Sequence, residues 1–123
     1  SGVLSPYDSL SIGILSALKA VGYGSGDLKM PVVTGQDCEV TSVKSIIAGE
    51  QYSSIFNNTA SLAKVAVDLT TQALSGGTVD VNAEYDNGAV KVPAKAISAI
   101  IITAENYEKE LVESGYIAAD LLK

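Results

Sequence analysis

The chain has 123 residues, 47% of them hydrophobic and 18% charged, which suits one domain with a real core and argues against disorder. Its net charge of −6 and its lack of histidine argue against binding to nucleic acid or anionic lipid, and remove the usual general base. No apolar run approaches the length of a membrane span, and the single cysteine excludes an internal disulfide.

The first half of the chain predicts two strand-to-helix units followed by a further strand. Residues 2–5 are a brief apolar stretch typical of a buried parallel strand, and the apolar spacing after them predicts a helix over 8–21. A second strand is expected over 31–34. A glycine-containing turn then leads to a helix over 40–48, and a strand follows over 51–56.

The second half of the chain predicts one long helix and then a β-rich tail. The expected elements are a helix over 60–74, an extended stretch over 78–81, a turn at Asn87-Gly88, a strand over 90–92, an apolar β-rich run over 96–103 and a last helix over 104–113. The apolar stripe of the long helix consists of Leu62, Val65, Ala66, Leu69 and Ala73. This order indicates an α/β fold with a mainly parallel sheet and flanking helices.

Two aspartates stand where predicted strands give way to helices. Ligands of open α/β sheets bind at the carboxyl ends of the strands, where Asp37 follows the second strand. Helix capping and ligand contact suit Asp37 equally, whereas the pattern alone favours a helix cap for Asp8. Cys38 is expected to be a small buried filler. The acidic stretch 80–91 lacks the glycine and the final glutamate of a calcium loop, so no metal or cofactor is expected.

Four segments, colinear over nearly the whole chain, resemble periplasmic sugar-binding proteins of ABC importers. They are GVLSPYDSLSIGILSALKAVGYG at 2–24, PVVTGQDCEVTSVKSIIAG at 31–49, AGEQYSSIF at 48–56, and NGAVKVP at 87–93 with the strand and Glu-Asn-Tyr after it. The resemblance is strongest to the xylose-binding and multiple-monosaccharide-binding subgroup. It implies the C-terminal part of a two-lobed type I periplasmic-binding-protein fold, and the start on Ser-Gly rather than Met also predicts a fragment.

The resemblance also implies how the segments are divided between two lobes. Residues 1–52 and 89–123 would belong to the second lobe, and the helix over 57–75 would belong to the first. A single fragment of this kind would leave the stripe of the long helix without its usual cover. We therefore expect that helix to fold back on its own domain or to pack against another copy, as a homo-oligomer or swapped dimer.

The function that the resemblance implies is non-catalytic binding of a monosaccharide of the xylose, glucose or galactose type for delivery to the membrane permease of an ABC importer. Asp37 and Asp8 are the expected hydroxyl contacts, joined by Tyr7 and Gln36. The protein would then be periplasmic, or extracellular and anchored as a lipoprotein. The ligand-sensing core of a sugar-responsive repressor shares this fold and is the alternative.

Overall fold

A computed structural model describes all 123 residues, Ser1–Lys123, and they form two compact units. Unit 1 comprises residues 1–56 together with 100–123, and unit 2 comprises residues 57–99. The assignment of these segments to the lobes of a longer protein stays a prediction. No helix of the chain combines the length and the apolar character needed to cross a membrane.

Unit 1 contains four short strands that follow one another in space. They are β1 (Gly2–Val3), β2 (Val32–Val33), β3 (Ser54–Phe56) and β6 (Ile100–Ile102). β1 pairs with β2 in parallel, a parallel bridge between Gln36 and Ile55 links the end of β2 to β3, and β6 runs antiparallel to β3. The α/β class with parallel pairing at its centre is therefore confirmed.

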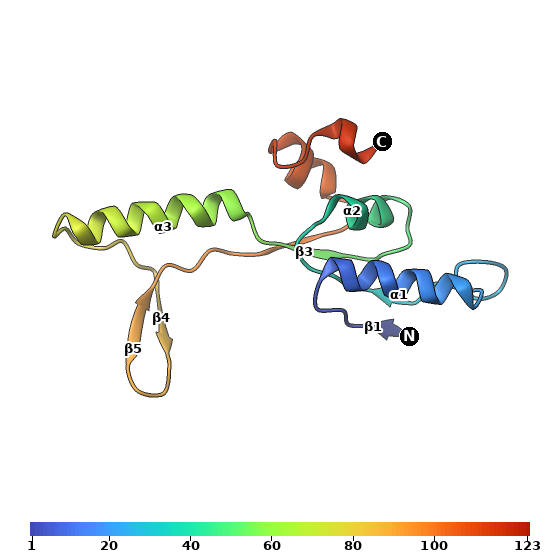
Figure 1. The fold of residues 1–123 in the computed structure, drawn as a ribbon, viewed down its shortest axis with the longest axis horizontal. Coiled ribbons are helices and arrows are strands. Elements are labelled where there is room, and N and C mark those ends of the chain that lie inside the picture. Colours follow the sequence, from blue (N-terminus) through green and yellow to red (C-terminus); the bar gives the residue numbers. More distant parts are fainter. The chain divides into compact units, whose positions relative to one another are not determined.

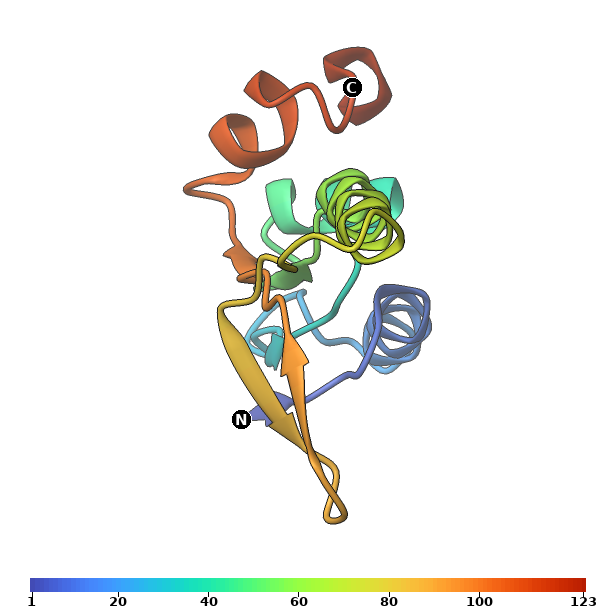
Figure 2. The same ribbon diagram turned by 90° about the vertical axis from the view of Figure 1, so that its left-hand side faces the viewer.

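The helices of unit 1 are α1 (Asp8–Ala20), α2 (Val40–Ile47), the π-helix η1 (Glu108–Glu113) and the 3-10 helix η2 (Ala119–Leu122). Figure 2 shows α1 and α2 on the same side of the strands. Both were predicted to within one residue. The last helix was predicted to begin at 104, but residues 104–106 form a turn in which the Asn106 Oδ1 atom accepts a bond from the Thr103 amide over 2.8 Å.

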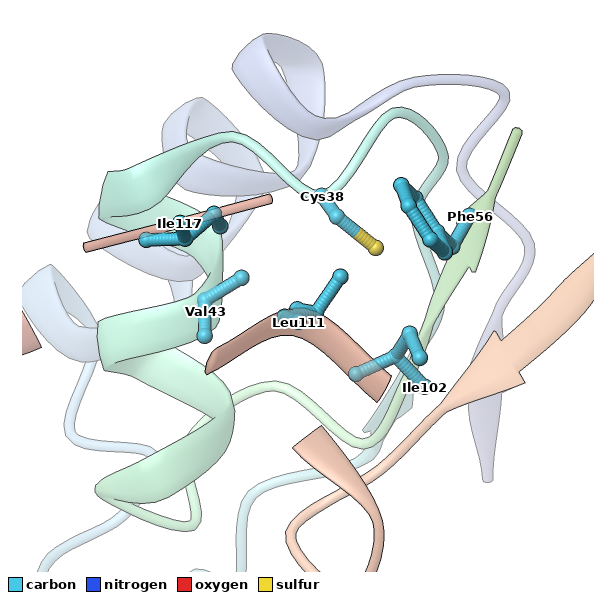
Figure 3. Close-up of a cluster of buried hydrophobic side chains, with 6 residues drawn as sticks. All are labelled: Cys38, Val43, Phe56, Ile102, Leu111 and Ile117. Carbon is cyan, nitrogen blue, oxygen red and sulfur yellow. The ribbon is translucent and has the colours of Figure 1, made fainter. Parts of the chain in front are cut away.

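The core of unit 1 is one cluster drawn from both of its chain segments. It consists of Cys38, Val43, Phe56, Ile102, Leu111 and Ile117, each at most 5% exposed. Figure 3 shows the Cys38 sulfur directed into this cluster, which confirms the prediction of a buried filler. Phe56 also packs edge-on against Tyr116, with ring centroids 4.5 Å apart. The returning tail therefore completes the core instead of lying on its surface.

The opposite face of the sheet is open. Along β3, Ser54 and Phe56 point into the core while Ile55 between them is 38% exposed, as period-two side chains require. Its partner on β6, Ile101, is 63% exposed. Leu4, directly after β1, is 91% exposed, so the expectation of a buried first strand is wrong. Parallel strands are buried only where both faces of the sheet are covered.

Unit 2 contains the long helix α3 (Thr59–Leu74) and a hairpin of β4 (Ala83–Asp86) and β5 (Lys91–Ala94), seen in Figure 1. The predicted cap of α3 is confirmed, because the Asn58 Oδ1 atom accepts a bond from the Ser61 amide over 2.9 Å. The turn at Asn87-Gly88 is confirmed as well. No residue of α3 is buried, so its predicted packing on a second copy stays a prediction.

Candidate functional site

The two strand-to-helix turns of unit 1 meet at a backbone hydrogen bond. The amide of Asp8 donates to the carbonyl of Gln36 over 3.0 Å, which joins the turn after β1 to the turn after β2. All four predicted contact residues lie in these two turns, Tyr7 and Asp8 in the first and Gln36 and Asp37 in the second. The structure therefore brings the predicted site residues together at the carboxyl ends of two neighbouring parallel strands.

Asp37 lies just beyond the carboxyl end of β2 and is exposed. Its amide donates to the carbonyl of Ile55 over 2.8 Å, and its φ is +95°. Cys38, the next residue, has a φ of +53°, and these are the two residues other than glycine with positive φ in the chain. Side-chain-bearing residues rarely adopt this conformation, and consecutive examples indicate a turn that its surroundings hold in place.

Asp8 is placed differently from either prediction. The N-cap of α1 is Tyr7, and Asp8 is the first helical residue, so the prediction that Asp8 caps its own helix is wrong. Its side chain is 0% exposed, whereas a contact with sugar hydroxyls needs an accessible carboxylate. One carboxylate oxygen, Oδ2, instead accepts the amide of Glu39, the residue before α2, over 2.9 Å.

The Asp8 carboxylate is the centre of a buried polar network. Ser54 Oγ donates to both of its oxygens over 2.9 Å, and Gln51 Nε2 donates to Oδ1 over 3.2 Å. Ser42 in turn donates to Gln51 Oε1 over 2.7 Å. Asp8, Ser42 and Ser54 are 0% exposed and Gln51 is 2% exposed. No lysine is among these partners, so the hydrogen bonds alone compensate for burying the carboxylate.

Burial changes the acidity of two groups in this region. Desolvation raises the pKa of the Asp8 carboxyl above its usual 3.8, and the hydrogen bonds from Ser54, Glu39 and Gln51 oppose that rise. Desolvation also raises the pKa of the Cys38 thiol from 9.0 to about 11, with smaller contributions from the negative charges of Asp8 and Asp37. Cys38 is therefore an inert thiol at neutral pH.

Tyr7 and Gln36 flank the two aspartates. The Tyr7 side chain is 47% exposed, and Gln36 is half-buried and lines a hollow of about 310 Å³ on the open face of the sheet, beside Thr34 and Ile55. A second hollow, of about 280 Å³, lies at the other end of the strands between the start of β2 and Thr103. None of the four predicted residues lines that second hollow, so it carries no argument about them.

Sequence reasoning missed the other members of the network, Gln51, Ser42 and Ser54. One signal pointed to Ser54. It alternates with Phe56 on the inward face of its strand, and a hydroxyl on a buried face needs a hydrogen-bond partner. Ser42 and Gln51 carry no comparable signal, because their burial depends on how α2 and the segment before β3 pack together.

The family model for a periplasmic binding protein domain matches residues 1–78 of the chain. The chain belongs to this family. The resemblance predicted from the four segments is thereby confirmed. Two relatives match further: the multiple sugar-binding periplasmic receptor ChvE of Rhizobium radiobacter is 57% identical over 98% of this chain, and the multiple sugar-binding periplasmic protein SbpA of Azospirillum brasilense is 52% identical over 93% of it.

Solved structures of similar fold carry the same family character. An ABC transporter solute-binding protein from Clostridium phytofermentans with bound β-D-glucose covers 95% of this chain with 38% identity and a TM-score of 0.81. A carbohydrate transporter solute-binding protein from Chloroflexus aurantiacus in complex with D-glucose covers 98% with 29% identity and a TM-score of 0.86. The periplasmic-binding-protein fold is therefore confirmed.

The chain spans about a third of the length of these relatives. It covers 35% of the Rhizobium radiobacter receptor and 32% of the Azospirillum brasilense protein. It likewise covers 36% of the Clostridium phytofermentans structure and 34% of the Chloroflexus aurantiacus structure.

Proposed function

We propose that this chain supplies one wall of the sugar site in a monosaccharide-binding component of an ABC importer. The observation that carries the proposal is the Asp8–Gln36 backbone bond, because it sets Asp37, Gln36 and Tyr7 side by side at the strand ends. Relatives named as multiple-sugar receptors and structures solved with glucose support the same conclusion. They also favour an importer component over the sugar-responsive repressor, which remains the alternative.

The chemistry of the proposed site follows from the groups that are accessible. An ionised Asp37 accepts two neighbouring sugar hydroxyls through charge-assisted bonds, and the amide of Gln36 has both a donor and an acceptor for a further hydroxyl. The exposed ring of Tyr7 offers an apolar face to the C–H side of a pyranose. No step in this binding needs proton transfer, which suits a non-catalytic protein.

The partners and the location belong to the same proposal. The relatives are named as periplasmic receptors and binding proteins, and we place this protein in the periplasm, or outside the cell with a lipid anchor, where it would meet the permease. The predicted homo-oligomer or swapped dimer through α3 would appear in light scattering as twice the monomer mass. A clean monomer at high concentration would contradict it.

The test uses a chimera, because a small ligand is bound well only when most of its surface is enclosed. Residues 1–123 replace the matching third of the Rhizobium radiobacter receptor, and calorimetry measures the affinity for D-glucose. We expect saturable binding that Asp37→Ala weakens at least 100-fold, since unpaired hydroxyls are costly to bury. A matched control, Asp27→Ala, changes an exposed loop residue away from both turns and should leave the affinity unchanged. Equal affinity of the Asp37→Ala variant and the parent would refute the proposed site.

A further inference from the structure

The segment from Asp37 to Glu39 has every one of its amides held by an acceptor from another part of the chain. The Asp37 amide donates to the carbonyl of Ile55 over 2.8 Å and the Cys38 amide donates to Ser54 Oγ over 3.1 Å. The Glu39 amide donates to Asp8 Oδ2 over 2.9 Å. These bonds lie across the two residues with positive φ, so they oppose the tendency of Asp37 and Cys38 to relax to ordinary backbone conformations.

Ser54 and Asp8 act on this segment as a pair. Ser54 Oγ accepts from the Cys38 amide and passes its own proton toward the Asp8 carboxylate, donating over 2.9 Å to either oxygen. One buried carboxylate thus fixes the Glu39 amide directly and the Cys38 amide through one hydroxyl. Neither Asp8 nor Ser54 has any exposed surface, so water does not compete for these bonds.

A direct contact between Asp8 and a ligand does not fit this arrangement. Its two oxygens already accept from Glu39, Ser54 and Gln51, and its side chain is fully covered. A role in capping α1 does not fit either, since its carboxylate bonds lead to β3 and to the start of α2. What its bonds share is the segment that carries Asp37.

We propose that Asp8 is a positioning residue: with Ser54 it holds the left-handed Asp37–Cys38 pair, and so fixes where the Asp37 carboxylate stands for the ligand. This inference rests on the proposed function, in which Asp37 binds sugar hydroxyls. It assigns to Asp8 a role that acts on the ligand only through the backbone of the neighbouring turn.

The first test measures amide hydrogen exchange by NMR on the sugar-free chain. Asp8→Asn and Ser54→Ala should each speed exchange of the Cys38 and Glu39 amides at least tenfold, while the Leu15 amide in the middle of α1 changes less than threefold. Ser16→Ala, an exposed position on α1, is the matched control and should change neither. Equal acceleration at all amides would mean a general loss of stability, and unchanged exchange at Cys38 and Glu39 would mean no hold on the turn. Either result overturns the proposal.

The second test measures D-glucose affinity of the same variants in the chimera. Ser54→Ala and Asp8→Asn should weaken binding about tenfold, less than Asp37→Ala, because they loosen the contact without removing it. Weaker binding by Asp8→Asn with unchanged exchange at the turn would indicate direct contact and overturn the positioning role. Faster exchange with unchanged affinity would overturn it as well. If Asp37→Ala binds as tightly as the parent, the proposed function fails, whereas the exchange result on the sugar-free chain still judges whether Asp8 holds the turn.

Discussion

The carboxylate of Asp8 occupies the space that a side chain on Gly35 would need. A Cβ atom built at position 35 overlaps the Oδ1 atom of Asp8, and it would also lie 2.6 Å from Gln51 Nε2 and 3.0 Å from Ser11 Oγ. Gly35 is therefore glycine because of close approach, not because of its backbone angles, since its φ is not positive. The buried network and the turn that carries Asp37 are built around this position.

Gly35→Ala should destabilise unit 1 by about 1–3 kcal/mol or more, because an extra methyl group in a packed interior forces its neighbours to move. The neighbours here are buried and hydrogen-bonded, so they have little room to move. Urea unfolding followed by circular dichroism measures the change. Gly13→Ala is the matched control, since a Cβ at position 13 meets no atom within 4 Å, and it should be neutral or stabilising. Equal stability of the two variants would contradict the role assigned to Gly35.

The local elements of unit 1 were predictable because their signals are local. The spacing of apolar residues gave α1 and α2 to within a residue, and the asparagines before α3 gave its cap. The strand β4 was missed because its sequence, AEYD, has neither an apolar run nor an apolar alternation. Pairing with β5 across the Asn87-Gly88 turn makes it a strand, and no propensity of its own does.

The candidate site was predictable in place but not in the roles of its residues. The rule that ligands meet the carboxyl ends of parallel strands located both turns. The role of Asp8 was not predictable, because it depends on Ser54, which is 46 residues away along the chain, and on Glu39, which is 31 residues away. An aspartate before a helix has the same local pattern whether it caps that helix or bonds to another one.

Leu111→Ala should cost about 2–5 kcal/mol, the usual range for a leucine removed from a packed core. Leu111 is 0% exposed and lies in the cluster that joins the C-terminal tail to Val43 and Phe56. The loss should unfold residues 1–56 and 100–123 together, because the cluster draws on both segments. Chemical denaturation gives the size of the effect. Leu121→Ala, at a half-exposed site in η2, should cost less than 1 kcal/mol in the same assay.

Cys38 should react with iodoacetamide far more slowly in the folded chain than in the urea-unfolded chain. A pKa of about 11 instead of 9.0 leaves about 100-fold less thiolate at pH 8, and the thiolate is the reactive form. Burial at 3% exposure slows the reaction further. Mass spectrometry follows the single cysteine without interference from another thiol. Comparable rates in the folded and unfolded chains would show that Cys38 is accessible and not held in the core.

Stability should depend on pH through Asp8 in a direction opposite to that of an ordinary salt-bridged aspartate. Because burial raises the pKa of Asp8 in the folded chain above 3.8, the folded chain binds more protons than the unfolded chain in the interval above that value. The contribution of Asp8 to stability is then fully present below 3.8 and is lost as the pH rises through the folded-state pKa.

Subtracting the unfolding free energy of Asp8→Asn from that of the parent isolates this contribution, since the other carboxyl groups titrate in both chains. The difference should fall as the pH rises from 3.5 toward neutrality and then become level. Urea unfolding at half-unit pH steps provides the measurement, and Ser16→Ala should give a difference that does not vary with pH. A difference that rises with pH would mean that the hydrogen bonds from Ser54, Glu39 and Gln51 outweigh desolvation, and that the pKa of Asp8 is lowered by folding.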